Sequence, residues 1–278
     1  MKQLAKRINE ALSPHYTQGE VGALARILAT ELLGISQTTY YLKDDVTLMP
    51  ADEARLADAL TRLQKAEPIQ YILGYSDFCG QRFKVTPAVL IPRPETSELV
   101  HRVVQEASDA KSILDIGTGS GCIAVSLAKL LPHANVTAWD ISPAAIEVAR
   151  ENSHANGCNV QFEQRDILTY TPSADRFDII VSNPPYIKEA EKAAMENNVL
   201  LWEPHIALFV PDDTPLLFYR AIAAKALTML TRGGRLYFEI NREHGAEVIA
   251  MLQQMGYSDT TLIKDFADND RMIRAIKG

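Results

Sequence analysis

From residue 112 onward, short apolar runs alternate with helical segments, and this alternation is the strongest constraint on the fold. Candidate helices at residues 122–131 and 144–156 separate the first strands. The strand candidates are residues 113–116, 136–140, 160–162, 177–182 and 235–240, followed by a closing pair at 260–263 and 272–276. Such a series predicts an α/β domain with a parallel sheet, covered on both faces by helices in right-handed crossovers.

The chain before this region has a different period. Leu4, Ile8 and Leu12 follow one another at helical spacing, and two further apolar stripes continue the pattern to about Gly74. Aromatic and β-branched residues then alternate around a glycine at residues 78–85, which predicts a hairpin. We therefore expect a small all-α bundle at residues 1–74, a hairpin and proline-rich linker at 75–94, and the α/β domain at 95–278.

Composition limits the partners and the compartment. The 278 residues carry a formal net charge of −7, whereas phosphate-neutralising proteins are basic, so nucleic acid is a disfavoured partner. The three cysteines, Cys79, Cys122 and Cys158, are far apart and predict neither a disulfide framework nor a metal site. The first residues lack an apolar signal core, and no apolar run is long enough for a membrane span. We expect a cytoplasmic protein with no metal.

A glycine-rich turn directly follows the first strand of the α/β region. It reads Gly117-Thr118-Gly119-Ser120-Gly121 and precedes a helix. In a doubly wound sheet this turn lies at the carboxyl edge, where ligands bind, and glycines let the backbone approach them. The G-x-G-x-G spacing is one residue tighter than the dinucleotide fingerprint, and Asp115 stands just ahead of it. This version favours S-adenosylmethionine over a pyrophosphate cofactor.

Two acids follow the next two strands. Asp140 ends the second strand, where a carboxylate can accept both ribose hydroxyl protons. Asp166 follows the third strand and is predicted to meet the adenine amino group, with Ile167 beside the ring. The alternative is that the glycines only form a tight turn and the acids are solvated strand ends. Strand, turn, helix and a correctly spaced acid together favour the cofactor site.

The fourth strand ends in Asn183-Pro184-Pro185-Tyr186. A planar nitrogen such as an amide is a poor nucleophile because its lone pair is delocalised, so an enzyme must hold it in line with the group it attacks. The side-chain carbonyl of Asn183 and the main-chain carbonyl of Pro184 can accept its two N–H bonds. The prolines stiffen this backbone, and Tyr186 offers a flat aromatic wall. The alternative is a plain Pro-Pro turn after a buried strand.

With these motifs in order, the chain resembles the HemK/PrmC family of protein-(glutamine-N5) methyltransferases, which modify the glutamine of the Gly-Gly-Gln motif in class 1 peptide chain release factors. The resemblance covers nearly the whole chain. Beyond the glycine turn and the tetrapeptide it includes Pro68-Ile69-Gln70-Tyr71-Ile72-Leu73-Gly74, Phe78, Leu90-Ile91-Pro92-Arg93-Pro94-Glu95-Thr96, Glu203-Pro204 and Asp268-Asn269-Asp270-Arg271. The stretch from Arg93 to Thr96 discriminates most, since general amino-methyltransferases share the other two motifs.

The resemblance implies a seven-stranded, Rossmann-like class I methyltransferase domain preceded by a substrate-recognition bundle. It implies direct methyl transfer from S-adenosylmethionine to the glutamine amide nitrogen. Asn183, Pro184 and Tyr186 are the expected catalytic residues, and Asn183 also meets the cofactor. Arg93, Thr96 and Pro185 join them in binding the substrate. Ser97 stands where many relatives carry an acid, and Ile167 where some carry an aromatic residue.

Three questions stay open at this stage. Glu203 and Glu239 are candidates for a general base, but a helix cap or an ion pair explains each equally well. An N6-adenine nucleic-acid methyltransferase would use the same clamp for an exocyclic amino group, although base flipping calls for a basic channel. A catalytically idle scaffold that binds translation factors is the third possibility, disfavoured by the intact clamp and acids.

Overall fold

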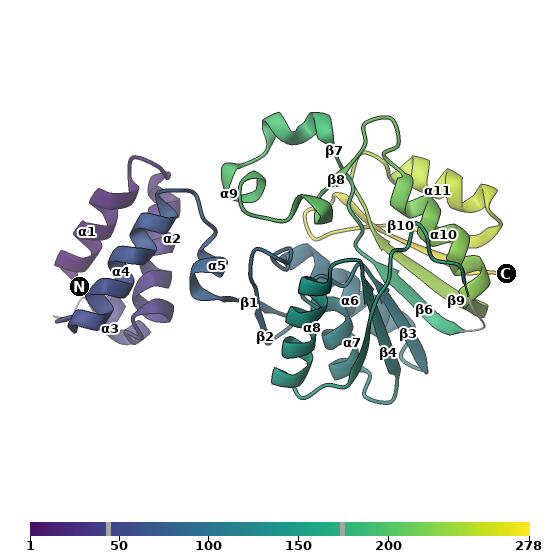
Figure 1. Cartoon of the computed structure of the whole chain (residues 1–278), viewed down its shortest axis with the longest axis horizontal. Coiled ribbons are helices and arrows are strands. Elements are labelled where there is room, and N and C mark those ends of the chain that lie inside the picture. Colours follow the sequence, from purple (N-terminus) through teal and green to yellow (C-terminus); the bar gives the residue numbers. More distant parts are fainter. Residues whose placement is uncertain (43–45, 173–175) are drawn as a thin grey trace. The chain divides into compact units, whose positions relative to one another are not determined.

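The computed structural model describes residues 1–42, 46–172 and 176–278. The chain divides into two compact units (Figure 1). The first unit contains Met1–Gly74 together with Glu196–Trp202, and the second contains Tyr75–Met195 and Glu203–Gly278. The hairpin and the proline-rich stretch at 75–94 therefore fold with the second unit.

The first unit is a bundle of short amphipathic helices around its own core. Leu4, Ile8 and Leu12 are buried on one face of α1, as their spacing predicts. Thr17 caps α2 in a reciprocal capping box with Glu20. The helices are α1 (Lys2–Leu12), α2 (Gln18–Ile27), the π-helical turn η1 (Leu28–Leu32), α3 (Gln37–Leu42), α4 (Pro50–Leu63) and α5 (Ile69–Leu73).

A distant segment completes the first unit. The short helix α9 (Asn197–Leu200) belongs to it although some 120 residues of the second unit precede it in the chain. The indole Nε1 of Trp202 donates a hydrogen bond to the main-chain oxygen of Lys65 over 3.1 Å. Nothing in the local periodicity of this segment indicates that association, because a contact across so many residues leaves no local pattern.

The second unit begins with a hairpin of β1 (Tyr75–Phe78) and β2 (Gln81–Lys84). Its two turn residues, Cys79 and Gly80, have φ angles of 47° and 71°, the left-handed pair that suits a two-residue hairpin turn. The prediction of a hairpin is confirmed, but the first strand starts three residues earlier than the apolar pattern suggests. The polar stretch from Tyr75 to Asp77 pairs in register with Arg82 to Lys84, so backbone pairing extends beyond the apolar alternation.

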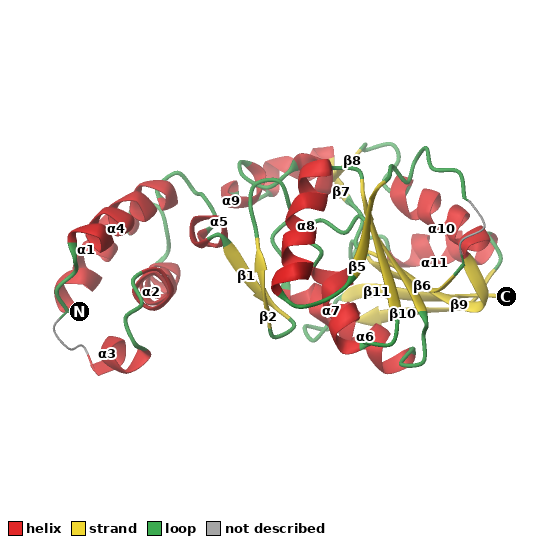
Figure 2. Ribbon diagram, turned by 60° about the horizontal axis from the view of Figure 1, so that its bottom comes forward, coloured by secondary structure: helices red, strands yellow, loops and turns green. Residues whose placement is uncertain are grey.

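The centre of the second unit is a mixed seven-stranded sheet (Figure 2) in the order β10-β11-β9-β6-β3-β4-β5. The strands β3, β4, β5, β6 and β9 are parallel, whereas β10 and β11, the predicted closing pair, are antiparallel. Their bounds are β3 (Ser112–Ile116), β4 (Asn135–Asp140), β5 (Val160–Gln164), β6 (Phe177–Ser182), β9 (Leu230–Glu239), β10 (Tyr257–Lys264) and β11 (Asp270–Lys277). The predicted seven-stranded fold is confirmed.

Helices cover both faces of the sheet. Side chains of α6 (Pro94–Glu106) and α7 (Cys122–Leu130) share one core with Ile113, while α10 (Leu217–Met229) and α11 (Gly245–Gln254) share the other with Leu114. Successive β3 residues thus enter opposite cores, as a strand buried on both faces requires. The remaining helix, α8 (Pro143–Ala155), contacts α7, β4 and β5.

An insertion that begins at the carboxyl end of β6 separates this strand from α10. It holds a two-stranded parallel sheet, and the main-chain N–H of Lys188 donates to the Glu191 carboxylate at the start of the helical turn that follows. Its elements in the second unit are β7 (Ile187–Lys188), the 3₁₀ turns η2 (Glu189–Ala194) and η3 (His205–Ala207), and β8 (Phe209–Val210). The alternating pattern read from the sequence did not include these short elements.

Candidate active site

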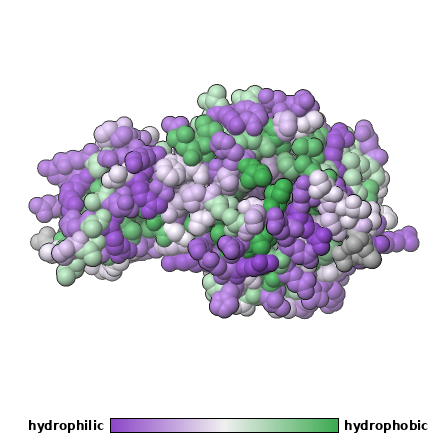
Figure 3. All heavy atoms as spheres, viewed as in Figure 1, coloured by the Kyte–Doolittle hydropathy of each residue, from purple (hydrophilic) through white to green (hydrophobic). Residues whose placement is uncertain are grey.

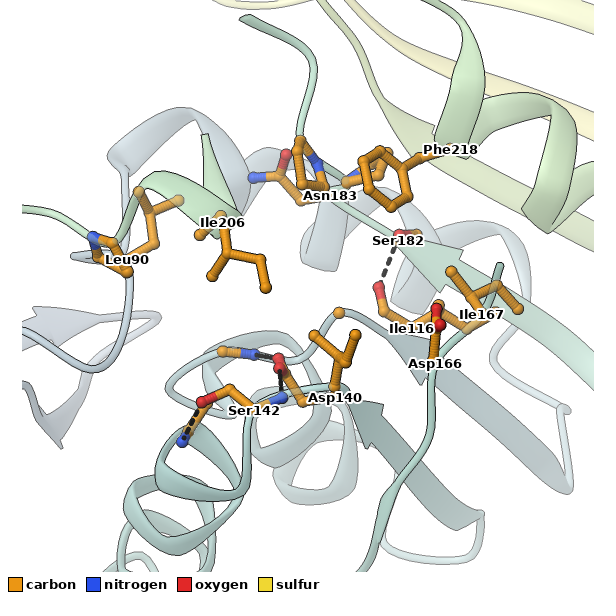
Figure 4. Close-up of a pocket in the computed structure, with 18 of the residues that line it drawn as sticks. Leu90, Ile116, Asp140, Ser142, Asp166, Ile167, Ser182, Asn183, Ile206 and Phe218 are labelled. Carbon is orange, nitrogen blue, oxygen red and sulfur yellow. Dashed lines mark hydrogen bonds between the residues drawn. The ribbon is translucent and has the colours of Figure 1, made fainter. Parts of the chain in front are cut away.

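A cavity of about 310 Å³ opens at the carboxyl edge of the sheet. Strand order reverses around β3, whose neighbours are β4 and β6, and such a switch point leaves a crevice for ligands. In Figure 4, Asn183 and Phe218 lie on one side of the cavity, and Asp140 and Ser142 lie on the other. The predicted site residues that line the cavity are Gly117, Gly119, Asp140, Asp166, Ile167, Asn183, Pro184 and Pro185.

The glycine turn owes its shape to left-handed backbone. Gly117, Gly119 and Gly121 have φ angles of 76°, 55° and 80°, which L-residues with a side chain rarely adopt. A Cβ atom on Gly117 or Gly119 would meet no atom within 4 Å, so the turn leaves open space beside its backbone. At Gly121 a Cβ atom would come within 3.0 Å of the Ala149 Cβ, so that glycine allows α7 and α8 to approach.

The polar residues of the turn serve its internal structure. The Thr118 hydroxyl donates a 2.7 Å hydrogen bond to Asp115 Oδ2, and Thr118 and Ser120 are both buried. The main-chain N–H groups of Gly117 and Thr118 both donate to the Trp139 carbonyl. Thr118, Ser120 and Gly121, which the sequence assigns to the cofactor, thus lie outside the cavity lining and shape the turn from behind.

The two predicted acids both face the cavity. Asp140 accepts hydrogen bonds from the main-chain N–H of Gly119 at 2.8 Å and of Ser142 at 2.9 Å, one at each carboxylate oxygen. Asp166 accepts from the main-chain N–H of Leu168 and the Thr169 hydroxyl. Each carboxylate oxygen has a second lone pair, so both acids can accept further bonds from hydroxyl or amino groups of a ligand.

Asp115 is buried behind the turn, and burial raises the pKa of its carboxyl to about 7, aided by the charge of Asp140. A raised pKa in the folded state contributes stability that is present below the unfolded value and lost as pH rises through about 7. We therefore expect Asp115→Asn to stabilise the ligand-free protein, relative to wild type, more at about pH 8 than at about pH 5.

Urea unfolding at these two pH values measures that difference. Asp178→Asn is the matched control, because main-chain and hydroxyl hydrogen bonds lower the pKa of the Asp178 carboxyl and move its titration below this range. Equal stability differences at both pH values for Asp115→Asn would contradict the assignment of the titration to Asp115.

The tetrapeptide lies at the end of β6, beside the glycine turn. The Ser182 hydroxyl donates a 2.6 Å hydrogen bond to the Ile116 carbonyl, which joins the ends of β6 and β3. Asn183, Pro184 and Pro185 line the cavity. Tyr186 lies outside the lining and packs against the core, with its hydroxyl 3.4 Å from Glu239 Oε1. Burial raises the pKa of the Tyr186 phenol, which keeps it protonated.

Two predicted site residues of the proline-rich stretch, Arg93 and Thr96, are absent from the cavity lining. The Arg93 guanidinium pairs with the buried carboxylate of Glu203, which also accepts the Ile91 main-chain N–H at 3.1 Å. Thr96 is buried and donates to the Glu239 carboxylate. Arg93 and Thr96 are therefore not brought to the cavity wall. Glu203 and Glu239, the two candidates for a general base, are thus both bonded to residues outside the cavity lining, Arg93 and Thr96 respectively.

Several lining residues were not predicted as site residues: Leu90, Ile141, Ser142, Leu168, Ile206 and Phe218. Ile141 directly follows the acid at the end of β4, and its position after Asp140 could have revealed it. Ile206 comes from the insertion and Phe218 from α10, and neither carries a local signal. Ile141, Leu168 and Ile206 are exposed apolar side chains that line the cavity. Figure 3 shows apolar residues gathered on the visible face of the second unit.

Within the described residues, no helix is both long enough and apolar enough to cross a membrane. Residues 1–42, 46–172 and 176–278 contain no grouping of three or more His, Cys, Asp or Glu side chains arranged to hold a metal ion.

The sheet order and the cavity at its switch point define a class I methyltransferase. Residues 95–203 match the family described as methyltransferase small domain, and residues 3–74 match the PrmC N-terminal domain. The release factor glutamine methyltransferase of Bacteroides thetaiotaomicron is 48% identical over 99% of both chains, and that of Flavobacterium psychrophilum is 41% identical over 99% of this chain and 98% of its own. The chain belongs to the family of release factor glutamine methyltransferases.

Solved structures agree on the fold. A methyltransferase from Pyrococcus furiosus superposes with a TM-score of 0.54, at 18% identity, over 83% of this chain and all of its own. At that identity the similarity concerns the architecture alone.

Proposed function

We propose that this enzyme transfers the methyl group of S-adenosylmethionine to the side-chain amide nitrogen of the glutamine in the Gly-Gly-Gln motif of class 1 release factors. The observation that carries the proposal is the arrangement of one cavity. Asn183 and Pro184, able to accept two N–H bonds, share its wall with Gly117, Gly119 and Asp140 of the predicted cofactor site. Family membership supports the same reaction.

The residues present fit the proposed cofactor. Gly117 and Gly119 leave open space beside their backbone, where a ligand can approach closely. Asp140 and Asp166 keep free acceptor lone pairs for the ribose hydroxyls and the adenine amino group, and Ile141 and Ile167 supply apolar surface for the ring. When bound, the cofactor supplies an electrophilic methyl group on a positively charged sulfur.

The clamp acts on the amide that attacks this methyl group. Asn183 Oδ1 and the Pro184 carbonyl each accept one N–H of the glutamine NH₂ group, which fixes the nitrogen and directs its lone pair. In this transfer the amide nitrogen would gain the methyl group, and the electron pair of the broken S–CH₃ bond would remain with the departing sulfur. The excess proton would then pass from the nitrogen to water, so no buried base is needed, in agreement with Glu203 and Glu239, which are bonded to Arg93 and Thr96.

Mass spectrometry of a release factor incubated with enzyme and S-adenosylmethionine tests the proposal. We expect one methyl increment on the Gly-Gly-Gln peptide, located on the glutamine, and none when that glutamine is replaced by alanine. A parallel incubation with DNA addresses the N6-adenine activity. Methylated adenine with an unmodified release factor would overturn the proposal, and so would a methyl group on another residue of the release factor.

We further propose that the first unit recognises the body of the release factor. Its match to the PrmC N-terminal domain and its separate core support an independent binding role. We expect an enzyme truncated to begin at Tyr75 to have a KM for the release factor about tenfold higher or more, because the first unit can no longer hold the protein substrate. The Kd for S-adenosylmethionine should change about twofold at most. Initial rates and calorimetry measure the two constants.

The truncation removes the partner of Trp202, so a second variant is the control. Trp202→Phe in the full chain removes the hydrogen bond to Lys65 but keeps an aromatic ring at this position and the first unit as a whole, so it should leave KM near the wild-type value. An unchanged KM after truncation would show that the first unit has another task.

A further inference from the structure

The side chain of Asn183 forms a hydrogen bond with Thr96, a buried residue that does not line the cavity. Its amide Nδ2 donates to the Thr96 hydroxyl oxygen over 3.4 Å, and that hydroxyl in turn donates to Glu239 Oε2 over 2.7 Å. We propose that Thr96 is a positioning residue: oriented by Glu239, it determines which end of the Asn183 amide faces the substrate. This inference rests on the proposed function.

Glu239 is the fixed end of this chain of hydrogen bonds. It lies at the end of β9, is 2% exposed, and accepts one hydroxyl at each carboxylate oxygen, from Thr96 and from Tyr186. Burial raises its pKa, while the Arg271 charge and the two hydroxyl donors act in the opposite direction. Two donors on two oxygens form the pattern that an ionised carboxylate accepts. The Tyr219 hydroxyl also donates to the Glu239 main-chain oxygen, which anchors the backbone.

The direction of the Thr96 hydroxyl follows from its single proton. A hydroxyl donates one hydrogen bond, and the buried Glu239 carboxylate takes the proton of Thr96 because an unpaired buried carboxylate is costly. Only lone pairs of the Thr96 oxygen then face Asn183. A lone pair accepts from the NH₂ end of an amide and repels its carbonyl end.

The consequence is a defined orientation of Asn183. With Nδ2 on Thr96, the carbonyl Oδ1 is the end left for the cavity that Asn183 lines. The reversed amide would set Oδ1 against the Thr96 oxygen and offer N–H donors to the donors of the glutamine NH₂ group. Without the Thr96 hydroxyl, both orientations become accessible, and only one of them accepts the substrate amide. Thr96 therefore acts on the methyl transfer through Asn183, although it does not reach the cavity.

Two substitutions at one position separate hydrogen bonding from packing. Thr96→Val keeps the shape and removes the hydroxyl, whereas Thr96→Ser keeps the hydroxyl and removes the methyl group. We expect Thr96→Val to lower kcat for glutamine methylation about 10- to 100-fold, with the Kd for S-adenosylmethionine within about twofold of wild type. Thr96→Ser should restore kcat to within about threefold of wild type. A purely structural role would not produce this split between kcat and cofactor binding.

Thr231→Val is the matched control. Its hydroxyl also bonds a carboxylate, Asp178 Oδ1 at 3.2 Å, but near the start of β6, at the opposite edge of the sheet. This variant should lose stability in urea unfolding without a change in kcat. Glu239→Gln tests the far end of the hydrogen-bond series that runs from Asn183 through Thr96 to Glu239. A glutamine amide can accept a hydrogen bond from Thr96 in one orientation and donate one to it in the other. We expect an intermediate kcat for this variant.

Distinct outcomes would overturn the inference. Wild-type kcat in Thr96→Val, or a loss in Thr96→Ser as large as in Thr96→Val, would show that the hydroxyl does not orient Asn183. If Thr96→Val does not fold, wild-type kcat in Glu239→Gln would still contradict the proposal. Failure of the wild-type enzyme to modify the release factor would refute the proposed function instead, so the two failures are distinguishable.

Discussion

Replacing Asn183 with alanine is expected to lower kcat about 100- to 1,000-fold, while the Kd for S-adenosylmethionine changes by about threefold at most. The variant loses the side-chain oxygen that aligns the amide nitrogen with the methyl group, but Asp140, Asp166 and the glycine turn stay in place. Steady-state rates on a release factor and calorimetry with the cofactor measure the two effects separately.

Asn156→Ala serves as the control for this substitution. Asn156 ends α8 and donates to the Arg82 carbonyl, a contact outside the cavity lining, so its loss should leave kcat unchanged. Full turnover in Asn183→Ala would refute the amide clamp. A large rise in the cofactor Kd with unchanged kcat would reassign Asn183 to the cofactor alone.

The second large effect concerns Asp140. Its carboxylate accepts the Gly119 main-chain N–H and lines the cavity where the ribose hydroxyls are expected. Hydrogen bonds to a charged group contribute about 1.5–3 kcal/mol each, and each 1.4 kcal/mol is tenfold in affinity. Asp140→Ala should therefore raise the Kd for S-adenosylmethionine about 100-fold or more, as calorimetry can measure.

Asp178→Ala provides the comparison for Asp140. Asp178 also accepts main-chain N–H groups, from Lys111 and Ser112, but it is outside the cavity lining. This variant should lose stability while its cofactor affinity stays at the wild-type value. Equal losses of affinity in both variants would mean that Asp140 acts only by holding the fold together.

The parts of the site that the sequence predicts are those that follow strands. Gly117, Asp140, Asp166 and Asn183 each come at or just after the end of a parallel strand, and parallel strands bring their carboxyl ends to one edge. The alternation of strands and helices, together with the rule that ligands bind at the carboxyl ends of parallel strands, is sufficient to predict that these residues lie together. The fold was predictable for the same reason, because alternating strands and helices admit few arrangements.

Contacts between residues far apart in the sequence could not be predicted from the local sequence pattern. Thr96 and Glu239 are 143 positions apart, and Trp202 reaches Lys65 across 137. Ile206 and Phe218 enter the cavity from the insertion and from α10, where apolar residues are ordinary. Tyr186 illustrates a related limit. An aromatic residue in a motif predicts a wall for a planar group, but here the ring packs against the core and its hydroxyl bonds Glu239.

The proposed mechanism requires that two oxygens, Asn183 Oδ1 and the Pro184 carbonyl oxygen, face the substrate amide. A crystal structure of the enzyme with S-adenosylhomocysteine and a Gly-Gly-Gln peptide would measure this directly. We predict that the glutamine NH₂ group donates to Asn183 Oδ1 and to the Pro184 carbonyl, at about 2.7–3.2 Å each, with its nitrogen facing the sulfur. A glutamine bound elsewhere, or an Asn183 amide that presents Nδ2 to it, would contradict this mechanism.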